Sequence, residues 1–255
     1  MKGRSIVIIG GTSGMGLAVA LACADQGARL VVLGKAHEEM NQLPTSIPIL
    51  LADAREEGSA NKAIETCLRE FGSFDGLCHI AGGSGRRMGD GPLHELSLEG
   101  WNYTMTLNLT SMMLSNQAAI RTFLANNTPG AILNMSSVLS HHPSPRYFST
   151  HAYATSKAAI NGMTRALAAH YAPNNIRVNA IAPGLIETPM SKRAATNEEI
   201  MAFVKKKQPL DGGRIGQPAD LTRLMCFLLS DESSFITGQL IHADGGWSVS
   251  EGIAR

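Results

Sequence analysis

Apolar runs of strand length alternate with helical patterns along the whole of this 255-residue chain. The first run, Ser5–Ile9, precedes a helical stretch in which Leu17, Leu21 and Ala24 share one face. Near-continuous apolar strands separated by helices are typical of a parallel sheet covered on both faces, and right-handed crossovers make it doubly wound. The pattern predicts a single-domain α/β fold over residues 1–255. We expect strands at Ser5–Ile9, Arg29–Leu33, Ile47–Ala52, Asp75–Ile80, Gly130–Met135, Arg177–Ala182 and Gln239–Ala243, and helices at Gly14–Gln26, Glu57–Phe71, Trp101–Leu124, Tyr153–Tyr171 and Pro218–Leu229.

The composition limits the partners of such a chain. With 44% hydrophobic and 17% charged residues it can bury a large core, and disorder is not expected. The formal net charge of +1 gives no reason to expect nucleic acid as a partner, and Lys205–Lys207 is interpreted as a solvated helix face. Four scattered cysteines without a C-x-x-C pair indicate reduced core thiols rather than a disulfide or zinc framework.

No segment predicts export or a membrane role. Ser5–Ile9 is too short for the apolar part of a signal peptide. The stretch from Trp101 to Ile120 carries no charge, but its Asn, Thr, Ser and Gln side chains are costly in lipid, so a helix buried within or between subunits explains it better. We therefore expect a cytoplasmic protein with no membrane partner.

A glycine-rich segment lies between the first expected strand and the first expected helix. Gly10, Gly14 and Gly16 let the backbone approach a pyrophosphate at the helix N-terminus. The spacing differs from the usual G-x-G-x-x-G, and a tight turn without a ligand is the alternative. The strand–loop–helix context favours a phosphorylated cofactor.

Tyr153 and Lys157 are four residues apart, so they lie one turn apart on the same helix face. A free phenol has a pKa near ~10, and a neighbouring ammonium favours its ionised form. Such a phenol can exchange protons near neutral pH, as carbonyl reduction and alcohol oxidation both require. Alone the spacing is a weak signal, and its meaning depends on the other motifs.

Together these motifs resemble the short-chain dehydrogenase/reductase family, and the resemblance covers essentially the whole chain. It implies a Rossmann-type fold and an NAD(P)(H)-dependent oxidoreductase that interconverts a ketone or other carbonyl and a secondary alcohol. The motifs that carry it are Gly10–Gly16, Leu107–Leu109 with the family's asparagine, Asn134–Ser137 with its serine, Tyr153–Lys157, Asn179–Gly184 followed by Thr188, Thr237–Gln239 and Asp244–Gly246.

The resemblance implies a catalytic set of Asn108, Ser137, Tyr153 and Lys157. Tyr153 is placed to exchange a proton with the substrate oxygen, and Ser137 to hydrogen-bond the carbonyl where negative charge develops. Lys157 is expected to lower the pKa of the phenol and to bind the cofactor ribose, and Asn108 to hold a water that relays the proton. In isolation Ser137 is better explained as a polar residue that ends a strand and Asn108 as a helix-kink residue, but their joint occurrence with Tyr153 and Lys157 favours function.

The chain departs from the family's pattern in its fourth strand, where Cys78–Gly82 stands in place of an Asn-Asn-Ala-Gly segment. Ala81 and Gly82 still permit close packing on the adenosine. His79 and Ile80 replace the amide pair, so we expect weaker bracing of the sheet and weaker cofactor affinity.

The cofactor choice depends on the end of the second strand. NAD binding usually uses an acidic residue there, but this chain has no acid until Glu38. Gly34 makes room, and Lys35 can meet a 2′-phosphate with help from Ser13, so NADP(H) is favoured over NAD(H); Lys35 as a solvated lysine is the alternative. Asp53 matches the family's adenine-contacting aspartate, or is a helix N-cap. The cofactor residues implied are Gly10, Thr12, Ser13, Gly14, Met15, Gly16, Gly34, Lys35, Asp53, Ala54, Ala81, Gly82, Gly83, Tyr153, Lys157, Pro183, Gly184, Ile186 and Thr188.

Three irregular stretches, Gly82–Glu95, Ser140–His151 and Leu185–Arg214, follow strands and are expected to overhang the crevice, the last as a substrate loop. They carry Arg86, Arg87, His141, His142 and Arg146, which either attract an anionic or sugar-like substrate or are ordinary surface cations. The histidines at 141, 142, 151 and 170 form no zinc-type motif, and no metal is expected.

A catalytically silent NADP-binding sensor on the same fold is the alternative function. A dehydratase or epimerase has no distinguishing residue in this sequence. The apolar helices at Trp101–Ile120 and Tyr153–Ala169 offer more apolar surface than one subunit needs. Since the resembling family uses these helices as a four-helix contact, we expect a homotetramer or homodimer acting on a small molecule.

Overall fold

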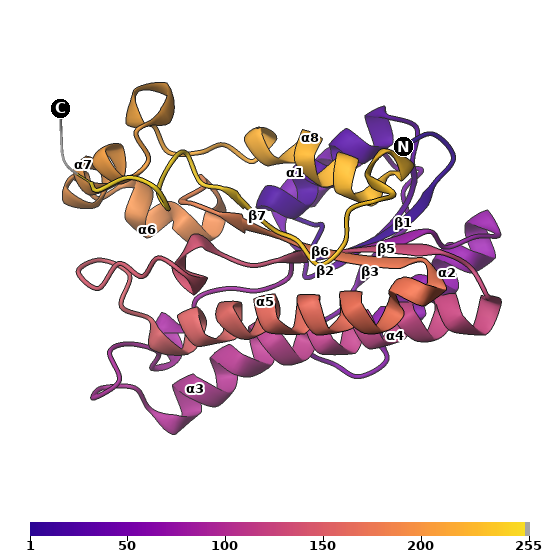
Figure 1. Cartoon of the computed structure of the whole chain (residues 1–255), viewed down its shortest axis with the longest axis horizontal. Helices are drawn as coiled ribbons and strands as arrows, with labels where there is room; N and C mark the ends of the chain where they lie inside the picture. The colour runs from indigo at the N-terminus through magenta and orange to yellow at the C-terminus, as the bar shows by residue number, and fades with distance from the viewer. Residues whose placement is uncertain (253–255) are drawn as a thin grey trace.

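The computed structural model describes residues 1–252 and contains one seven-stranded, fully parallel sheet (Figure 1). The strand order β3-β2-β1-β4-β5-β6-β7 confirms the expected doubly wound, Rossmann-type α/β fold. The strands are β1 Ser5–Ile9, β2 Arg29–Gly34, β3 Ile49–Leu51, β4 Gly76–His79, β5 Gly130–Met135, β6 Ile176–Pro183 and β7 Leu240–Ala243.

Helices cover both faces of the sheet. Successive residues of β1 point to opposite faces, so Ile6 and Ile8 join one core cluster while Val7 and Ile9 join the other. Burial on both faces is the reason that these strands are apolar at nearly every position. The first face packs against α1 Gly14–Asp25 and α8 Ala219–Leu229, and the second against α2 Ser59–Phe71, α4 Ser111–Asn126 and α5 His151–Tyr171 (Figure 1).

The expected long helix from Trp101 to Leu124 is two helices. The helix α3 spans Leu98–Met105 and continues into α4 through a π-helical turn at Thr106–Thr110. It begins before Trp101 because the Ser97 hydroxyl accepts a hydrogen bond from the Gly100 amide at 3.0 Å. A π-turn inside a helix is often associated with a functional position, and this one contains Asn108.

The stretch expected to be irregular, Leu185–Arg214, contains two further helices, α6 Lys192–Ala195 and α7 Glu198–Lys207. The second begins where the Asn197 side chain accepts a hydrogen bond from the Ile200 amide at 2.9 Å. Ala194 and Val204 from these helices pack on Trp247 in a small third core cluster. The segment therefore forms a packed cap with its own apolar contacts.

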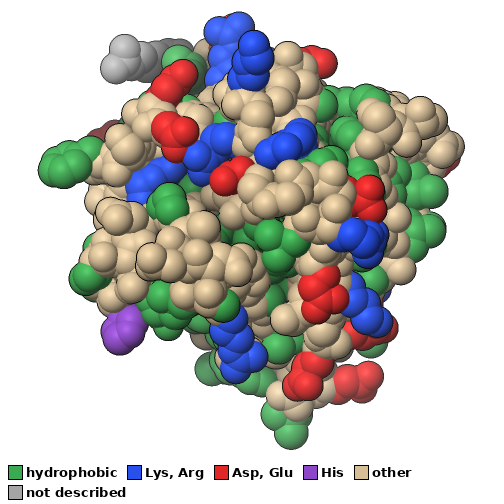
Figure 2. All heavy atoms as spheres, turned by 90° about the vertical axis from the view of Figure 1, so that its right-hand side faces the viewer, with side chains coloured by type: hydrophobic (Ala, Val, Ile, Leu, Met, Phe, Trp, Pro, Cys, Tyr) green, Lys and Arg blue, Asp and Glu red, His purple; other side chains and the backbone are tan. Residues whose placement is uncertain are grey.

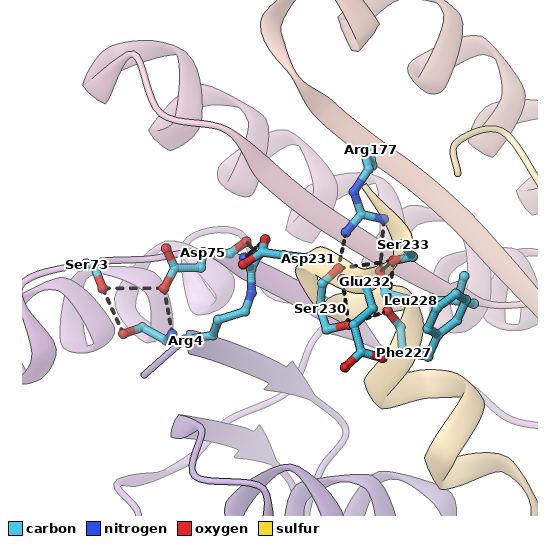
Figure 3. A network of polar contacts seen from close by, with 11 residues as sticks. Arg4, Ser73, Asp75, Arg177, Phe227, Leu228, Ser230, Asp231, Glu232 and Ser233 are labelled. Atoms are coloured by element: carbon cyan, nitrogen blue, oxygen red, sulfur yellow. Dashed lines mark hydrogen bonds and ion pairs between the residues drawn. The ribbon is translucent and has the colours of Figure 1, made fainter. Parts of the chain in front are cut away.

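Arginines connect the amino-terminal ends of the strands to neighbouring elements (Figure 3). The Asp75 carboxylate accepts a hydrogen bond from the Ser5 amide at 2.7 Å, and Arg4 donates to the Asp75 carbonyl and pairs with Asp231. Arg177 donates to the Leu228 and Ser230 carbonyls at 3.1 and 2.9 Å, at the C-terminus of α8. A cation is favourable at that end of a helix dipole. Polar contacts therefore hold the amino-terminal ends of the strands, while their carboxyl ends remain open for a ligand.

The four cysteines are free and buried, as expected. Cys23 of α1 and Cys226 of α8 lie with their sulfur atoms 3.4 Å apart, and this contact together with burial raises the pKa of the Cys23 thiol. Acidic and basic side chains are interspersed over the face drawn in Figure 2, which agrees with the near-neutral net charge. Among residues 1–252, no helix combines the length and the apolar character that crossing a bilayer demands.

Candidate active site

A large cavity opens at the carboxyl ends of the strands. The register places Ile9 opposite both Leu33 and His79, and Met135 opposite Ile181, so the loops after these strands begin at one edge. The cavity has a volume of about 910 Å³. Every site residue predicted from the sequence lines it except Gly16 and Asn108, which lie behind its wall.

The glycine loop is packed so closely that side chains are excluded. Gly10 has a φ of +86°, and a Cβ there would lie 2.6 Å from the Ala81 amide nitrogen. A Cβ on Gly16 would lie 1.9 Å from the Gly10 carbonyl oxygen, so Gly16 allows α1 to pack against the loop instead of contacting a ligand. Gly34 likewise has no room for a side chain, because a Cβ there would lie 2.4 Å from the Thr12 hydroxyl. These approaches bring backbone amides and the N-terminus of α1 to the cavity, which fits a dinucleotide pyrophosphate.

Glu39 contacts the glycine loop, although no sequence motif indicated it. It lies in a short 3₁₀ turn, Glu38–Gln42, and its carboxylate accepts a hydrogen bond from the Gly14 amide at 2.8 Å. An acidic side chain at the N-terminus of α1 is favoured by the helix dipole. Since Glu39 lies in an irregular segment far from Gly14 in the sequence, no periodic signal indicated the contact.

Asp53 follows β3 and is held by two cations. Arg55 binds both of its carboxylate oxygens, at 2.6 to 3.1 Å, and Lys35 lies 3.0 Å away. Hydrogen bonds from Arg55 are the main reason that the pKa of Asp53 is well below its usual value. Gly58, with a left-handed φ of +83°, precedes α2, so the alternative that Asp53 caps this helix is wrong.

Asn108 lies within the π-turn and is completely buried. Its Oδ1 atom accepts from the Gly83 amide at 3.0 Å, and its Nδ2 group donates to the Gly83 and Thr104 carbonyls, both at 2.9 Å. Three of the four hydrogen-bonding positions of the amide are thus used by the backbone. The structure therefore shows Asn108 fixing the loop after β4, and leaves at most one lone pair of its side chain for a water.

Tyr153, in the first turn of α5, faces the cavity together with Ser137. The buried carboxylate of Asp90 accepts hydrogen bonds from the Ala152 and Tyr153 amides, both at 3.0 Å, and so satisfies the N-terminus of this helix. Burial raises the pKa of the Tyr153 phenol, and a hydrogen bond with the Ser137 side chain opposes that rise. The protein's own groups thus keep this phenol in its protonated form at neutral pH.

Lys157 lies one turn further along α5 and is 3% exposed. Its Nζ atom donates to the Met135 carbonyl at 2.9 Å and lies 5.5 Å from the centre of the Tyr153 ring. Burial lowers the pKa of Lys157 to about 7. The pKa of the Tyr153 phenol was expected to be lowered by Lys157, but it is raised, because burial outweighs any effect of this cation.

The loss of the amide pair was expected to weaken the bracing of the sheet, but His79 supplies this bracing. Its imidazole is 2% exposed, with Nδ1 at 2.8 Å from the Ser115 hydroxyl and Nε2 at 3.1 Å from the Ala81 carbonyl. Burial lowers the pKa of His79 to about 3, so the ring is neutral at physiological pH. It links the end of β4 to α4 just beyond Asn108.

An apolar wall completes the cavity on the side of the overhanging loops. Trp247, 1% exposed, contacts Phe148 and Phe203 with ring centres 5.9 and 5.6 Å away. The motif Asp244–Gly246 predicted from the sequence does not include Trp247, although a tryptophan directly after a tight turn was an available signal. Asp244 forms that turn by accepting from the Gly246 and Ser248 amides.

The cationic residues of the loops divide into two groups. Arg86 and Arg87 line the cavity. Lys192 and Arg193 also line it, although they were not among the cations predicted from the sequence. His141, His142 and Arg146 lie outside the lining, and Arg146 pairs with Glu199. Within residues 1–252, no three His, Cys, Asp or Glu side chains are grouped so that they could hold a metal ion.

The glycine loop and the side chains of Tyr153, Ser137 and Lys157 line one cavity, an arrangement that a nucleotide-dependent oxidoreductase requires. Comparison with known proteins agrees, since residues 10–248 match the family described as Enoyl-(Acyl carrier protein) reductase. The chain is 32% identical to the 3-oxoacyl-[acyl-carrier-protein] reductase FabG of Thermotoga maritima over 96% of this chain and 98% of that protein. It is equally 32% identical to the cis-4-hydroxycyclohexanecarboxylate dehydrogenase of Sinomonas cyclohexanicum, over 96% and 97% of the two chains.

A solved structure of a short-chain type dehydrogenase/reductase from Mycobacterium ulcerans superposes with a TM-score of 0.88 at 28% identity, covering 98% of this chain and 91% of that one. The chain belongs to the short-chain dehydrogenase/reductase family. It is an NAD(P)-dependent oxidoreductase that acts on CH–OH groups.

Proposed function

We propose that this enzyme reduces a ketone to a secondary alcohol, and oxidises the alcohol in reverse, with Tyr153 as the proton donor and acceptor. The observation that carries the proposal is that Tyr153, Ser137 and Lys157 line the same cavity as the glycine loop. When bound, the nicotinamide supplies or accepts the hydride. The glycine loop, Gly34 and Lys35 would hold the adenosine half of the cofactor, and Pro183–Thr188 would hold its nicotinamide half.

In this mechanism the protonated Tyr153 phenol gives its proton to the substrate oxygen as charge develops there. Ser137 donates a second hydrogen bond to that oxygen. Lys157, buried beside the tyrosine ring, stabilises the phenolate that remains, because a nearby cation favours the charged form. Asn108 holds Gly82 and Gly83 against this cluster, since a Cβ on Gly82 would lie 2.7 Å from Oδ1 of Asn108 and 3.3 Å from Nζ of Lys157.

The reaction is tested by following NADPH and NADH oxidation with the purified enzyme against a panel of cyclic ketones, linear ketones and sugars. Consumption of cofactor with formation of the matching secondary alcohol supports the proposal. If the protein binds NADPH but reduces none of the panel and oxidises none of the matching alcohols, the alternative of a silent cofactor-binding sensor is preferred.

We propose NADP(H) as the preferred cofactor. The Lys35 side chain lines the cavity, is 65% exposed and shares Asp53 with Arg55, so it can turn toward a 2′-phosphate without losing a buried contact. Lys35→Met should weaken NADPH binding about fivefold, the effect of one exposed charge pair, and leave NADH binding within twofold. Fluorescence titration measures both affinities. The matched control is Lys206→Met on the exposed side of α7, and tighter NADH than NADPH binding by the wild-type enzyme would reject the preference.

We also propose a homodimer or homotetramer built on α4 and α5. These helices form the outer layer over one face of the sheet (Figure 1). The exposed Leu98 and Leu124 lie near the two ends of the α3–α4 pair. Small-angle scattering at micromolar concentration should give two or four times the 27.1 kDa mass of the chain. A scattering mass of one chain would contradict the assembly.

A further inference from the structure

The cavity has an excess of positive charge that the cofactor site does not use. Among the described residues that line it, Asp53 is the one acid, and that carboxylate already binds Arg55 and Lys35. Lys35 and Lys157 have roles in the site described above. Four bases remain, on the short turn after β4 and on the segment after β6: Arg86, Arg87, Lys192 and Arg193.

Two of these bases, Arg86 and Arg193, line the same cavity, and the charge of Arg193 acts on Arg86. The pKa of Arg86 is lowered first by burial and next by the charge of Arg193, and the charge of Asp90 opposes this lowering. Within residues 1–252 neither guanidinium forms an ion pair with a carboxylate, and the Arg193 side chain forms one hydrogen bond, a long one of 3.5 Å to the Tyr147 carbonyl. Like charges that converge in a partly desolvated cleft repel each other, and an anion between them removes the repulsion.

The backbone segments that carry both arginines are anchored relative to Tyr153, while the arginine side chains are exposed. The Asp90 amide donates to the Gly85 carbonyl at 3.1 Å, while the Asp90 carboxylate binds the Tyr153 amide, so the Arg86 turn and Tyr153 share one buried anchor. On the other side, Ala194 is 3% exposed and packs in the Trp247 cluster, which fixes the short helix of Arg193. The two segments therefore have a defined place beside Tyr153, from which both arginine side chains line the cavity.

We propose that Arg86 and Arg193 bind an anionic oxygen group of the substrate, a carboxylate or a phosphate, carried several bonds from the reacting carbonyl. Guanidinium groups match both anions with paired hydrogen bonds. The inference rests on the proposed carbonyl reduction and names the class of substrate. His141, His142 and Arg146, the other cations that the sequence suggested, take no part because they do not line the cavity.

The first experiment compares kcat/KM for matched substrate pairs. The keto acids 4-oxopentanoate, 5-oxohexanoate and 6-oxoheptanoate are measured against their methyl esters, and dihydroxyacetone phosphate against dihydroxyacetone. At least one anion should exceed its neutral partner by about tenfold or more, since one hydrogen bond to a charged group contributes about 1.5–3 kcal/mol. The number of carbons between carbonyl and carboxylate that gives the largest ratio of kcat/KM values indicates the distance from Tyr153 to the arginines. The comparison of the two anion types distinguishes a carboxylate site from a phosphate site.

The second experiment measures the same ratio in Arg86→Met and Arg193→Met. Each change should bring the ratio of anion to neutral substrate about tenfold closer to one. Arg146→Met is the control, because this arginine lies on the neighbouring loop, pairs with Glu199 and lies outside the cavity lining. Thermal midpoints within about 2 °C of wild type would show that the variants are folded.

The outcomes separate this inference from the proposed function. Neutral ketones reduced as fast as every anion, or a ratio that both variants leave unchanged, would overturn the anion site and leave the reductase standing. Weaker NADPH binding in the variants with an unchanged ratio would assign the arginines to the cofactor and also overturn it. If no carbonyl is reduced, calorimetry of 4-oxopentanoate and dihydroxyacetone phosphate with the NADP⁺ complex decides: binding that both variants weaken supports the site, and no binding overturns it.

Discussion

Replacing Tyr153 with phenylalanine should lower kcat for ketone reduction by about 10²- to 10⁴-fold, the usual contribution of one positioned proton donor. The variant loses only the hydroxyl, so the ring beside Lys157 and the helix cap at Asp90 are retained. NADPH affinity should therefore stay within about twofold of wild type. Steady-state kinetics with the best ketone of the panel and fluorescence titration of NADPH measure the two effects.

Tyr171→Phe is the matched control for this prediction. Tyr171 ends the same helix, α5, and does not line the cavity, so the same loss of a hydroxyl should leave turnover unchanged. Turnover by Tyr153→Phe at the wild-type rate would show that another group supplies the proton. A parallel loss of NADPH binding would mean that the hydroxyl acts on the cofactor instead.

The fold could be predicted because the physics of a parallel sheet appears directly in the sequence. Strands buried on both faces must be apolar at successive positions, and all seven expected strands are present within a few residues of their predicted ends. The same topology brings loops after parallel strands to one edge. The resemblance to the family assigned Gly10, Ser137 and Thr188 to one site, and this topology explains why residues so distant in the sequence line one cavity.

The contacts that escaped prediction depend on irregular backbone. The π-turn at Thr106–Thr110 preserves helical periodicity on both sides, so nothing in the hydrophobic pattern distinguishes it from a continuous helix. Glu39 reaches Gly14 from a 3₁₀ turn, and Arg193 reaches the cavity from a helix of four residues. His79 was interpreted as a weakness because its partner Ser115 is far away in the sequence, and only the packing of α4 on β4 makes that bond visible.

The buried charge of Lys157 should make the enzyme less stable than it would be with an apolar residue there. Burial lowers the pKa of this group from 10.5 to about 7. Between those two values the unfolded chain binds more protons than the folded one, so this group's contribution to stability rises with pH from about 7 to 10.5. Below pH 7 both states carry the proton and the full penalty of the buried charge remains.

Lys157→Met should consequently raise the free energy of unfolding by about 1–2 kcal/mol at pH 7 and below, and the gain should shrink as the pH rises toward 10. The thermal midpoint should increase by about 2–8 °C. The same change removes the cation that stabilises the Tyr153 phenolate, so kcat should fall by about 100-fold or more. Calorimetric melting from pH 6 to pH 10 without cofactor, beside steady-state kinetics, measures the opposed effects.

Lys206→Met, which removes an exposed charge from α7, is the control and should shift neither the pH dependence nor the rate. A Lys157→Met enzyme less stable than wild type at every pH would identify the bond from Nζ to the Met135 carbonyl as a net structural contact. An increase in stability joined to the loss of turnover would instead show that the fold retains a destabilising buried lysine because the reaction needs it.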